Sequence, residues 1–179
     1  LEFDALWEEI RPFLEDRLVV AHNAAFDISV LRQTLTLYGI PFPTFDYCCT
    51  MVMSRHFYSY LENAKLNTVN QHLGYSFTHH HAGADASACA NILMNISKEL
   101  QLHDINAIAA AVGFKLGKLF PGGYNACGTN GGGVTSQNIY NASAQPKLDY
   151  YSCTTDFFKD KIVAFTGSLS SLSRSEAIS

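Results

Sequence analysis

The feature that most constrains the fold is the apolar run Leu18–Ala21, which is followed closely by a segment with helical periodicity. The run is short and partly β-branched, as is typical of a buried strand. Beyond it, apolar residues recur at spacings of three and four until Gly39, and these are Ile28, Leu31, Leu35 and Tyr38. Such spacing predicts a core-facing helix that ends at the glycine. A buried strand leading into this helix predicts an α/β fold.

Asp27 stands at the head of that helix, in the hexapeptide His22-Asn23-Ala24-Ala25-Phe26-Asp27. A carboxylate there projects from the carboxyl end of the strand, where open α/β sheets place their sites. The alternative is that Asp27 only offsets the helix dipole, and for Asp27 considered alone this interpretation is favoured.

A second hexapeptide, His80-His81-Ala82-Gly83-Ala84-Asp85, opens another predicted helix that runs to about Leu102. Its apolar stripe consists of Cys89, Ile92, Leu93, Ile96 and Leu100. Two carboxylates brought together can hold divalent metal ions, and a nearby imidazole can deprotonate an attacking water. The pair of motifs therefore predicts metal-dependent hydrolysis of a phosphodiester.

The run His79–His81 also allows other interpretations. It is either a solvated loop or part of a zinc cluster with Cys48, Cys49 or Cys89. No Cys-x-x-Cys or His-x-x-x-His spacing supports zinc.

The two motifs, in this order, resemble the second and third exonuclease motifs of the DnaQ-like (DEDDh) 3′-to-5′ exonucleases, the family of the proofreading ε subunit of bacterial DNA polymerase III. The resemblance covers roughly residues 1 to 102. It implies an RNase H-like fold, two Mg²⁺ or Mn²⁺ ions, and removal of nucleoside monophosphates from the 3′ end of DNA or RNA.

The resemblance also implies roles for single residues. Asp27 and Asp85 would be metal ligands, and His80 would be the general base. The nucleic-acid-binding residues would be Asn23 and Phe26, with His22 beside them at the end of the strand.

The chain departs from the family at its start. The first family motif, an Asp-x-Glu on the first strand, is expected before a helix over residues 3 to 14, whose last turn Pro12 should distort. We therefore expect a fragment that lacks its opening strands and two catalytic acidic residues, and that is inactive alone.

Between the motifs, a strand is predicted over 44–50 and helices over 50–58 and 67–73. Arg55, His56 and Lys65 could touch a nucleic-acid backbone, although solvated surface is the favoured interpretation.

Three parts are expected along the chain: the exonuclease domain to residue 102, a helix and linker over 103–155, and a further domain from 156. A helix is predicted over 105–112, and the Gly-, Asn- and Ser-rich stretch 113–151 should stay apart from the core. The segment from 158 resembles the strand, turn and helix that open a BRCT domain. That resemblance implies phosphate binding by Thr166 and Gly167.

Composition agrees with an intracellular enzyme. The net charge is −4, which argues against a sequence-independent DNA coat, and five irregularly spaced cysteines suggest free thiols. No apolar run is long enough to span a membrane and no signal peptide is visible, so we expect a cytoplasmic protein. The alternative to an exonuclease is a nucleic-acid-binding or polymerase-docking module, in replication or repair, that uses the fold as a scaffold.

Overall fold

The computed structural model describes residues 2–78, 81–142 and 162–163, with side chains excepted at 140–142 and 162–163. The helices are α1 (Phe3–Ile10), the 3₁₀ helix η1 (Arg11–Phe13), α2 (Ala24–Leu37), α3 (Thr50–Phe57), α4 (Leu66–His72), α5 (Ala82–Leu100), α6 (Ile105–Val112) and α7 (Ser136–Ala142). The strands are β1 (Leu18–Ala21), β2 (Phe45–Cys49), β3 (Phe114–Lys115), β4 (Gly117–Phe120), β5 (Gly123–Asn125), β6 (Gly128–Thr129) and β7 (Ile162–Val163).

The main sheet is mixed and has the strand order β5-β4-β2-β1-β7. β1 runs parallel to β2, with Val20 opposite Cys48, and β7 lies parallel on the other side of β1. The pairs β2–β4 and β4–β5 are antiparallel. Because parallel strands need a crossover, α2 connects β1 to β2, and this β-α-β unit is the predicted α/β pattern.

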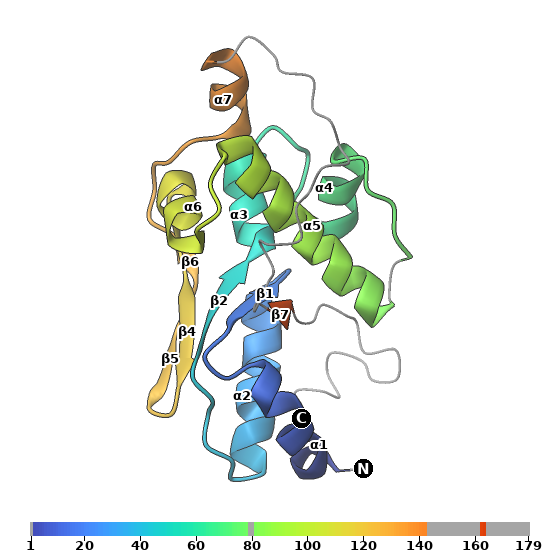
Figure 1. The fold of residues 1–179 in the computed structure, drawn as a ribbon, viewed down its shortest axis with the longest axis vertical. Coiled ribbons are helices and arrows are strands. Elements are labelled where there is room, and N and C mark those ends of the chain that lie inside the picture. Colours follow the sequence, from blue (N-terminus) through green and yellow to red (C-terminus); the bar gives the residue numbers. More distant parts are fainter. Residues whose placement is uncertain (1, 79–80, 143–161, 164–179) are drawn as a thin grey trace.

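Helices cover the sheet in two groups (Figure 1). α1 and α2 lie in the lower half of the view, and α3 to α6 lie in the upper half. α2 packs on β1 and β2, whereas α5 packs on β1 and β7 and contacts α3, α4 and α6. The helices predicted before residue 113 are confirmed to within a few residues, and α1 ends at Ile10 and is followed by η1, which contains Pro12, as expected.

The segment after α6 differs from the predicted linker. β4 joins the main sheet beside β2, where Leu119 lies opposite Phe45, and both side chains are at most 2% exposed. Phe114 is buried in the same core. The prediction that residues 113–151 stay apart from the core is therefore wrong for 114–129.

Glycines allow this segment to pack closely. A Cβ on Gly113 would lie 2.1 Å from the carbonyl oxygen of Gly132, and one on Gly133 would lie 2.4 Å from the backbone of Val112. All three glycines have positive φ, which residues with a Cβ rarely adopt. The glycine run is thus docked on the end of α6, where Val134 N donates to the carbonyl of Ala111.

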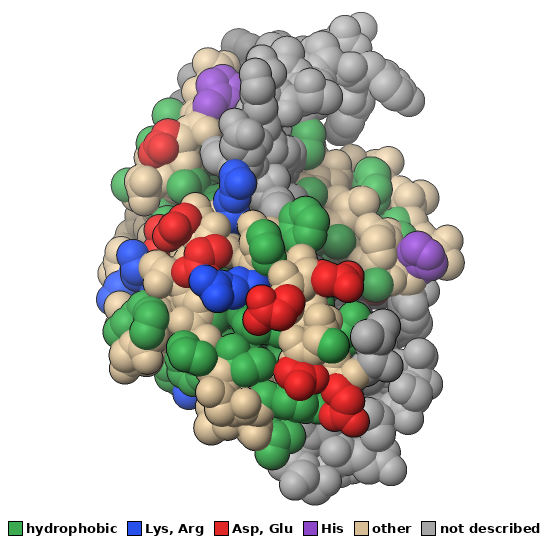
Figure 2. Space-filling model, turned by 60° about the horizontal axis from the view of Figure 1, so that its bottom comes forward, with side chains coloured by type: hydrophobic (Ala, Val, Ile, Leu, Met, Phe, Trp, Pro, Cys, Tyr) green, Lys and Arg blue, Asp and Glu red, His purple; other side chains and the backbone are tan. Residues whose placement is uncertain are grey.

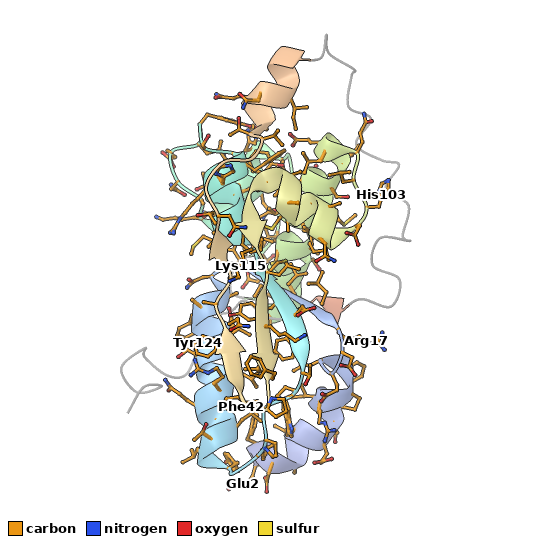
Figure 3. The ribbon with its side chains drawn as sticks, turned by 90° about the vertical axis from the view of Figure 1, so that its left-hand side faces the viewer. Glu2, Arg17, Phe42, His103, Lys115 and Tyr124 are labelled. Carbon is orange, nitrogen blue, oxygen red and sulfur yellow. The ribbon has the colours of Figure 1, made fainter. Side chains whose placement is uncertain are left out.

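The β4–β5 hairpin is fastened to the rest of the molecule by two aromatic side chains. Tyr47 of β2 donates its hydroxyl to the carbonyl of Asn125 at 3.0 Å. The guanidinium of Arg32 on α2 lies 3.6 Å from the ring centroid of Tyr124, which Figure 3 shows on the hairpin side of the molecule. The hairpin thereby contacts both β2 and α2.

Several predicted features lie outside the described residues. The strand expected at 161–165 is described only at 162–163, where it is extended. His80, Thr166 and Gly167 are not described, nor is the helix expected after 173. Within the described part of the chain, no helix has the length and apolar character to cross a membrane.

Candidate active site

The first motif lies where β1 passes into α2. Asn23 connects them in the left-handed conformation, with φ 71° and ψ 43°, which asparagine tolerates better than most residues. Its side chain makes no capping hydrogen bond to α2. Phe26 and Asp27 follow on the first turn, and both side chains are half-buried. This sharp entry turns the first motif toward the carboxyl ends of β1 and β2.

Asp27 occupies an environment that disfavours its charged form. Burial raises the pKa of this carboxyl from 3.8 to about 7, partly opposed by a backbone hydrogen bond, and the nearby Cys49 adds to the increase. A buried carboxylate of this kind gains most from a neighbouring cation.

Cys49 lies at the end of β2, between the beginnings of two helices. A hydrogen bond from the thiol of Cys127 lowers the pKa of Cys49 to about 6 against the effect of burial. The backbone amides of Val52, Ala24 and Asn23 lower it further. The sulfur thus marks the point where the first turns of α2 and α3 converge.

His22 holds this end of the sheet together. Its Nε2 donates to the carbonyl of Ala64 at 2.9 Å, and its Nδ1 lies 3.0 Å from Oγ1 of Thr50. Because a carbonyl only accepts, Nε2 carries a proton, and Oγ1 of Thr50 also donates to the carbonyl of Ala21 at 3.3 Å. Only 9% of His22 is exposed, and both ring nitrogens lie within hydrogen-bond distance of oxygen atoms of the protein. Its contact with nucleic acid stays a prediction.

Asp85 lies on the first turn of α5 and is 3% exposed. Cys89, one turn later on the same face, has its sulfur 3.3 Å from Oγ1 of Thr50. Burial raises the pKa of Cys89 to about 12, and the charges of Cys49 and Asp27 contribute. Asp27 is thus close enough to affect Cys89, which lies one turn along α5 from Asp85.

Two neighbouring contacts fix the start of α5. Nδ1 of His81 accepts from the amide of Ala84 at 3.3 Å and caps the helix next to His80. The buried Asn70 of α4 donates to the carbonyl of Ala88, and Asn91 donates to Oδ1 of Asn70. These bonds set the rotation of α5, and with it the position of Asp85.

Thr50 and Asn70 were missed as positioning residues. A polar residue directly after the predicted strand 44–50 was the available signal for Thr50, since parallel strands end at one edge of a sheet. Asn70 gave no signal, because its bonds reach across to another helix.

The described residues include possible metal ligands but no complete cluster of them. Among them, no three His, Cys, Asp or Glu side chains are grouped so that they could hold an ion. Asp27 and Asp85 supply carboxylate oxygens, the ligands that Mg²⁺ and Mn²⁺ prefer. Carboxylate donors of this kind fit a divalent ion.

Comparison with known proteins agrees with this arrangement. A family model described as Exonuclease matches residues 1–93. The mixed α/β architecture, with its two helix-borne carboxylates, is consistent with an RNase H-like exonuclease fold. The chain belongs to this exonuclease family.

The curated relatives are bacterial polymerases. The chain is 33% identical over 112 residues to the DNA polymerase III PolC-type of Clostridium perfringens, a match that covers 59% of this chain and 8% of the relative. It is 33% identical over 109 residues to the protein of the same name from Caldanaerobacter subterraneus, covering 58% and 8%. The matched region thus spans less than a tenth of these relatives. No solved structure matches the chain.

Proposed function

We propose that this protein contributes the second and third motifs of a metal-dependent 3′-to-5′ exonuclease, which releases nucleoside monophosphates from the 3′ end of a DNA strand. The observation that supports the proposal is that Asp27 lies on the first turn of α2 and Asp85 on the first turn of α5, and that both helices pack on β1. The two carboxylates come from motifs almost sixty residues apart. Two carboxylates at the starts of helices that pack on the same strand are expected of a shared site.

Asp27 and Asp85 would hold two Mg²⁺ or Mn²⁺ ions together with further carboxylates. When bound, such ions stabilise charge on the scissile phosphate and lower the pKa of a water molecule. The burial that raises the pKa of Asp27 to about 7 supports this role, because a carboxylate kept from water is stabilised by a cation. Its own amide hydrogen bond keeps the side chain oriented.

The remaining motif residues would bind the end of the strand and move a proton. His80 would accept the proton of the attacking water. Asn23 and Phe26 would contact the terminal nucleotide, since both stand at the open end of β1. The water oxygen would bond to phosphorus as the bond to the 3′ oxygen of the preceding nucleotide breaks.

A polymerase context is proposed from the names of the relatives. The rival function is a nucleic-acid-binding or polymerase-docking module without catalysis. Phosphate binding by Thr166 and Gly167 is a separate proposal from the BRCT resemblance, and it concerns residues outside the described ranges.

The test compares the protein with a version extended at its start by a strand bearing Asp-x-Glu. Both are incubated with a 3′-labelled oligodeoxynucleotide in Mg²⁺, Mn²⁺ or EDTA. We expect release of labelled nucleoside monophosphate by the extended version, none in EDTA, and little from the chain alone, because each ion needs several oxygen ligands. Retention of the oligonucleotide without any cleavage by the extended version would favour the binding module.

A further inference from the structure

A pocket of about 410 Å³ lies beside the candidate active site. It is formed by one face of α3 and the loop that leads to α4, and its lining includes Met51, Arg55, Leu61, Glu62, Asn63 and Lys65. The volume is within the range of small-molecule sites.

The pocket is joined to the site by short connections. Ala64, which lines it, accepts the hydrogen bond from Nε2 of His22. Met51, at its other end, follows Thr50, whose hydroxyl lies between His22 and Cys89. The pocket therefore begins one residue away from the junction that positions both motifs.

The charges of the pocket suit a phosphate. Arg55 and Lys65 are exposed, and among the described residues neither forms an ion pair with a carboxylate. Arg55 makes only a weak contact with the sulfur of Met51, at 3.6 Å. The carboxylate of Glu62 accepts from the side chain of Asn63 at 3.0 Å. Two cations thus face the pocket with a single carboxylate that is already hydrogen-bonded.

The lower face of the molecule has a different distribution of charge. Figure 2 shows that on the lower face of the molecule acidic and basic side chains are intermingled. The net charge of −4 likewise provides no general attraction for nucleic acid. A local pair of cations near the site is therefore the feature best suited to hold a strand.

We propose that this pocket binds the substrate strand one or two nucleotides before its 3′ end. Arg55 and Lys65 contact backbone phosphates, and the apolar side chains of Met51 and Leu61 support a base. The inference rests on the proposed function, because it needs a strand end at Asp27 and Asp85. It adds a subsite that favours oligonucleotides over mononucleotides.

The test measures binding to the whole 179-residue chain in Mg²⁺, with thymidine monophosphate and with a 5′-labelled single-stranded oligothymidylate of eight residues. Arg55→Ala should weaken oligonucleotide binding about tenfold, which corresponds to loss of one charge-assisted contact. Binding of the mononucleotide should stay unchanged. The slope of log K against log salt should fall by about 0.7 for each phosphate contact removed.

Lys65→Ala should act in the same direction, and Arg55→Glu should have a larger effect. The matched control is Lys118→Ala, since Lys118 pairs with Asp46 at 3.7 Å and lies away from the pocket. An equal loss in Lys118→Ala, or unchanged oligonucleotide binding in Arg55→Ala, would overturn the subsite and leave the exonuclease proposal standing. Failure of the unaltered chain to bind either ligand would overturn the subsite and count against substrate binding by Asn23 and Phe26.

Discussion

β2 has two neighbours, and they serve the molecule differently. On one side β1 brings His22 and the first motif to a junction of polar side chains that reaches Thr50 and Cys89. On the other side β4 brings the buried Leu119 and no predicted catalytic residue. The candidate catalytic residues thus lie on the β1 side of β2, whereas the β4 side contributes to the hydrophobic core.

The largest expected effect is at Asp85. In the extended, active version, Asp85→Asn should reduce turnover by about a thousandfold or more. When several residues act together in catalysis, the loss of any one of them removes nearly all of the activity. The amide keeps the size of the side chain but loses the charge that holds a cation. The melting temperature should change little beside that loss. Product release and thermal melting measured on the same preparation check both statements.

A matched control is Glu99→Gln, which alters a carboxylate near the other end of α5. It should leave turnover within about twofold. If Asp85→Asn kept full turnover, Asp85 would not belong to the active site, and the two sides of β2 would no longer differ in function.

The β1 side of β2 was predictable because the sequence patterns that specify it are local. The run Leu18–Ala21 and the periodicity from Ile28 to Tyr38 specify a strand and a helix without knowledge of any distant partner. The stripe that begins at Cys89 did the same for α5. Asp27 and Asp85 were found as motif residues at helix starts, which the structure places on the first turns of α2 and α5.

The other side of β2, which pairs with the β4–β5 hairpin, was not predictable in this way. β4 has four residues, and its partner β2 lies about seventy positions earlier, so neither its register nor its burial is encoded nearby. Gly131, Gly132 and Gly133 suggested a linker, whereas Gly133 packs so closely on the end of α6 that a Cβ there would meet the backbone of Val112. Thr50 was hidden for the same reason, since its role depends on β2 lying beside β1.

A substitution in β4 should separate packing from chemistry. A Cβ on Gly117 would lie 2.2 Å from Cζ of Tyr47, whose ring is 2% exposed and whose hydroxyl is bonded to Asn125. The ring cannot move without losing that bond, so Gly117→Ala should destabilise the fold by about 1–3 kcal/mol. Urea unfolding followed by tryptophan fluorescence measures it through the buried Trp7.

Gly128→Ala is the control for this change, because a Cβ there meets nothing within 4 Å. Its free energy of unfolding should stay within about 0.5 kcal/mol of the unaltered chain. At a temperature where both variants of the extended version are folded, their turnover should be equal. Equal stability of the two variants would mean that β4 does not lie on Tyr47 as described.

The smallest expected effect concerns Glu99, which lies on the same helix as Asp85 but serves no proposed chemistry. Tyr58 donates its hydroxyl to Oε1 of Glu99 at 2.8 Å, and Oε2 is buried with no hydrogen-bond partner among the described residues. Burial raises the pKa of this carboxyl above 4.5, partly opposed by the bond from Tyr58. The folded state therefore keeps a proton that the unfolded chain has already released.

Stability contributed at Glu99 should consequently fall as pH rises from 4.5 to the raised pKa. Glu99→Gln removes this loss and still accepts from Tyr58, so its melting temperature should exceed that of the unaltered chain by about 1–2 °C at pH 7. The difference should shrink toward pH 4.5. Tyr58→Phe should act in the opposite sense, since the carboxylate without its donor becomes harder to ionise. If the melting temperatures of all three proteins changed with pH in the same way between pH 4.5 and 8, Glu99 would ionise as easily in the folded state as in the unfolded state. Burial at the far end of α5 would then not raise its pKa.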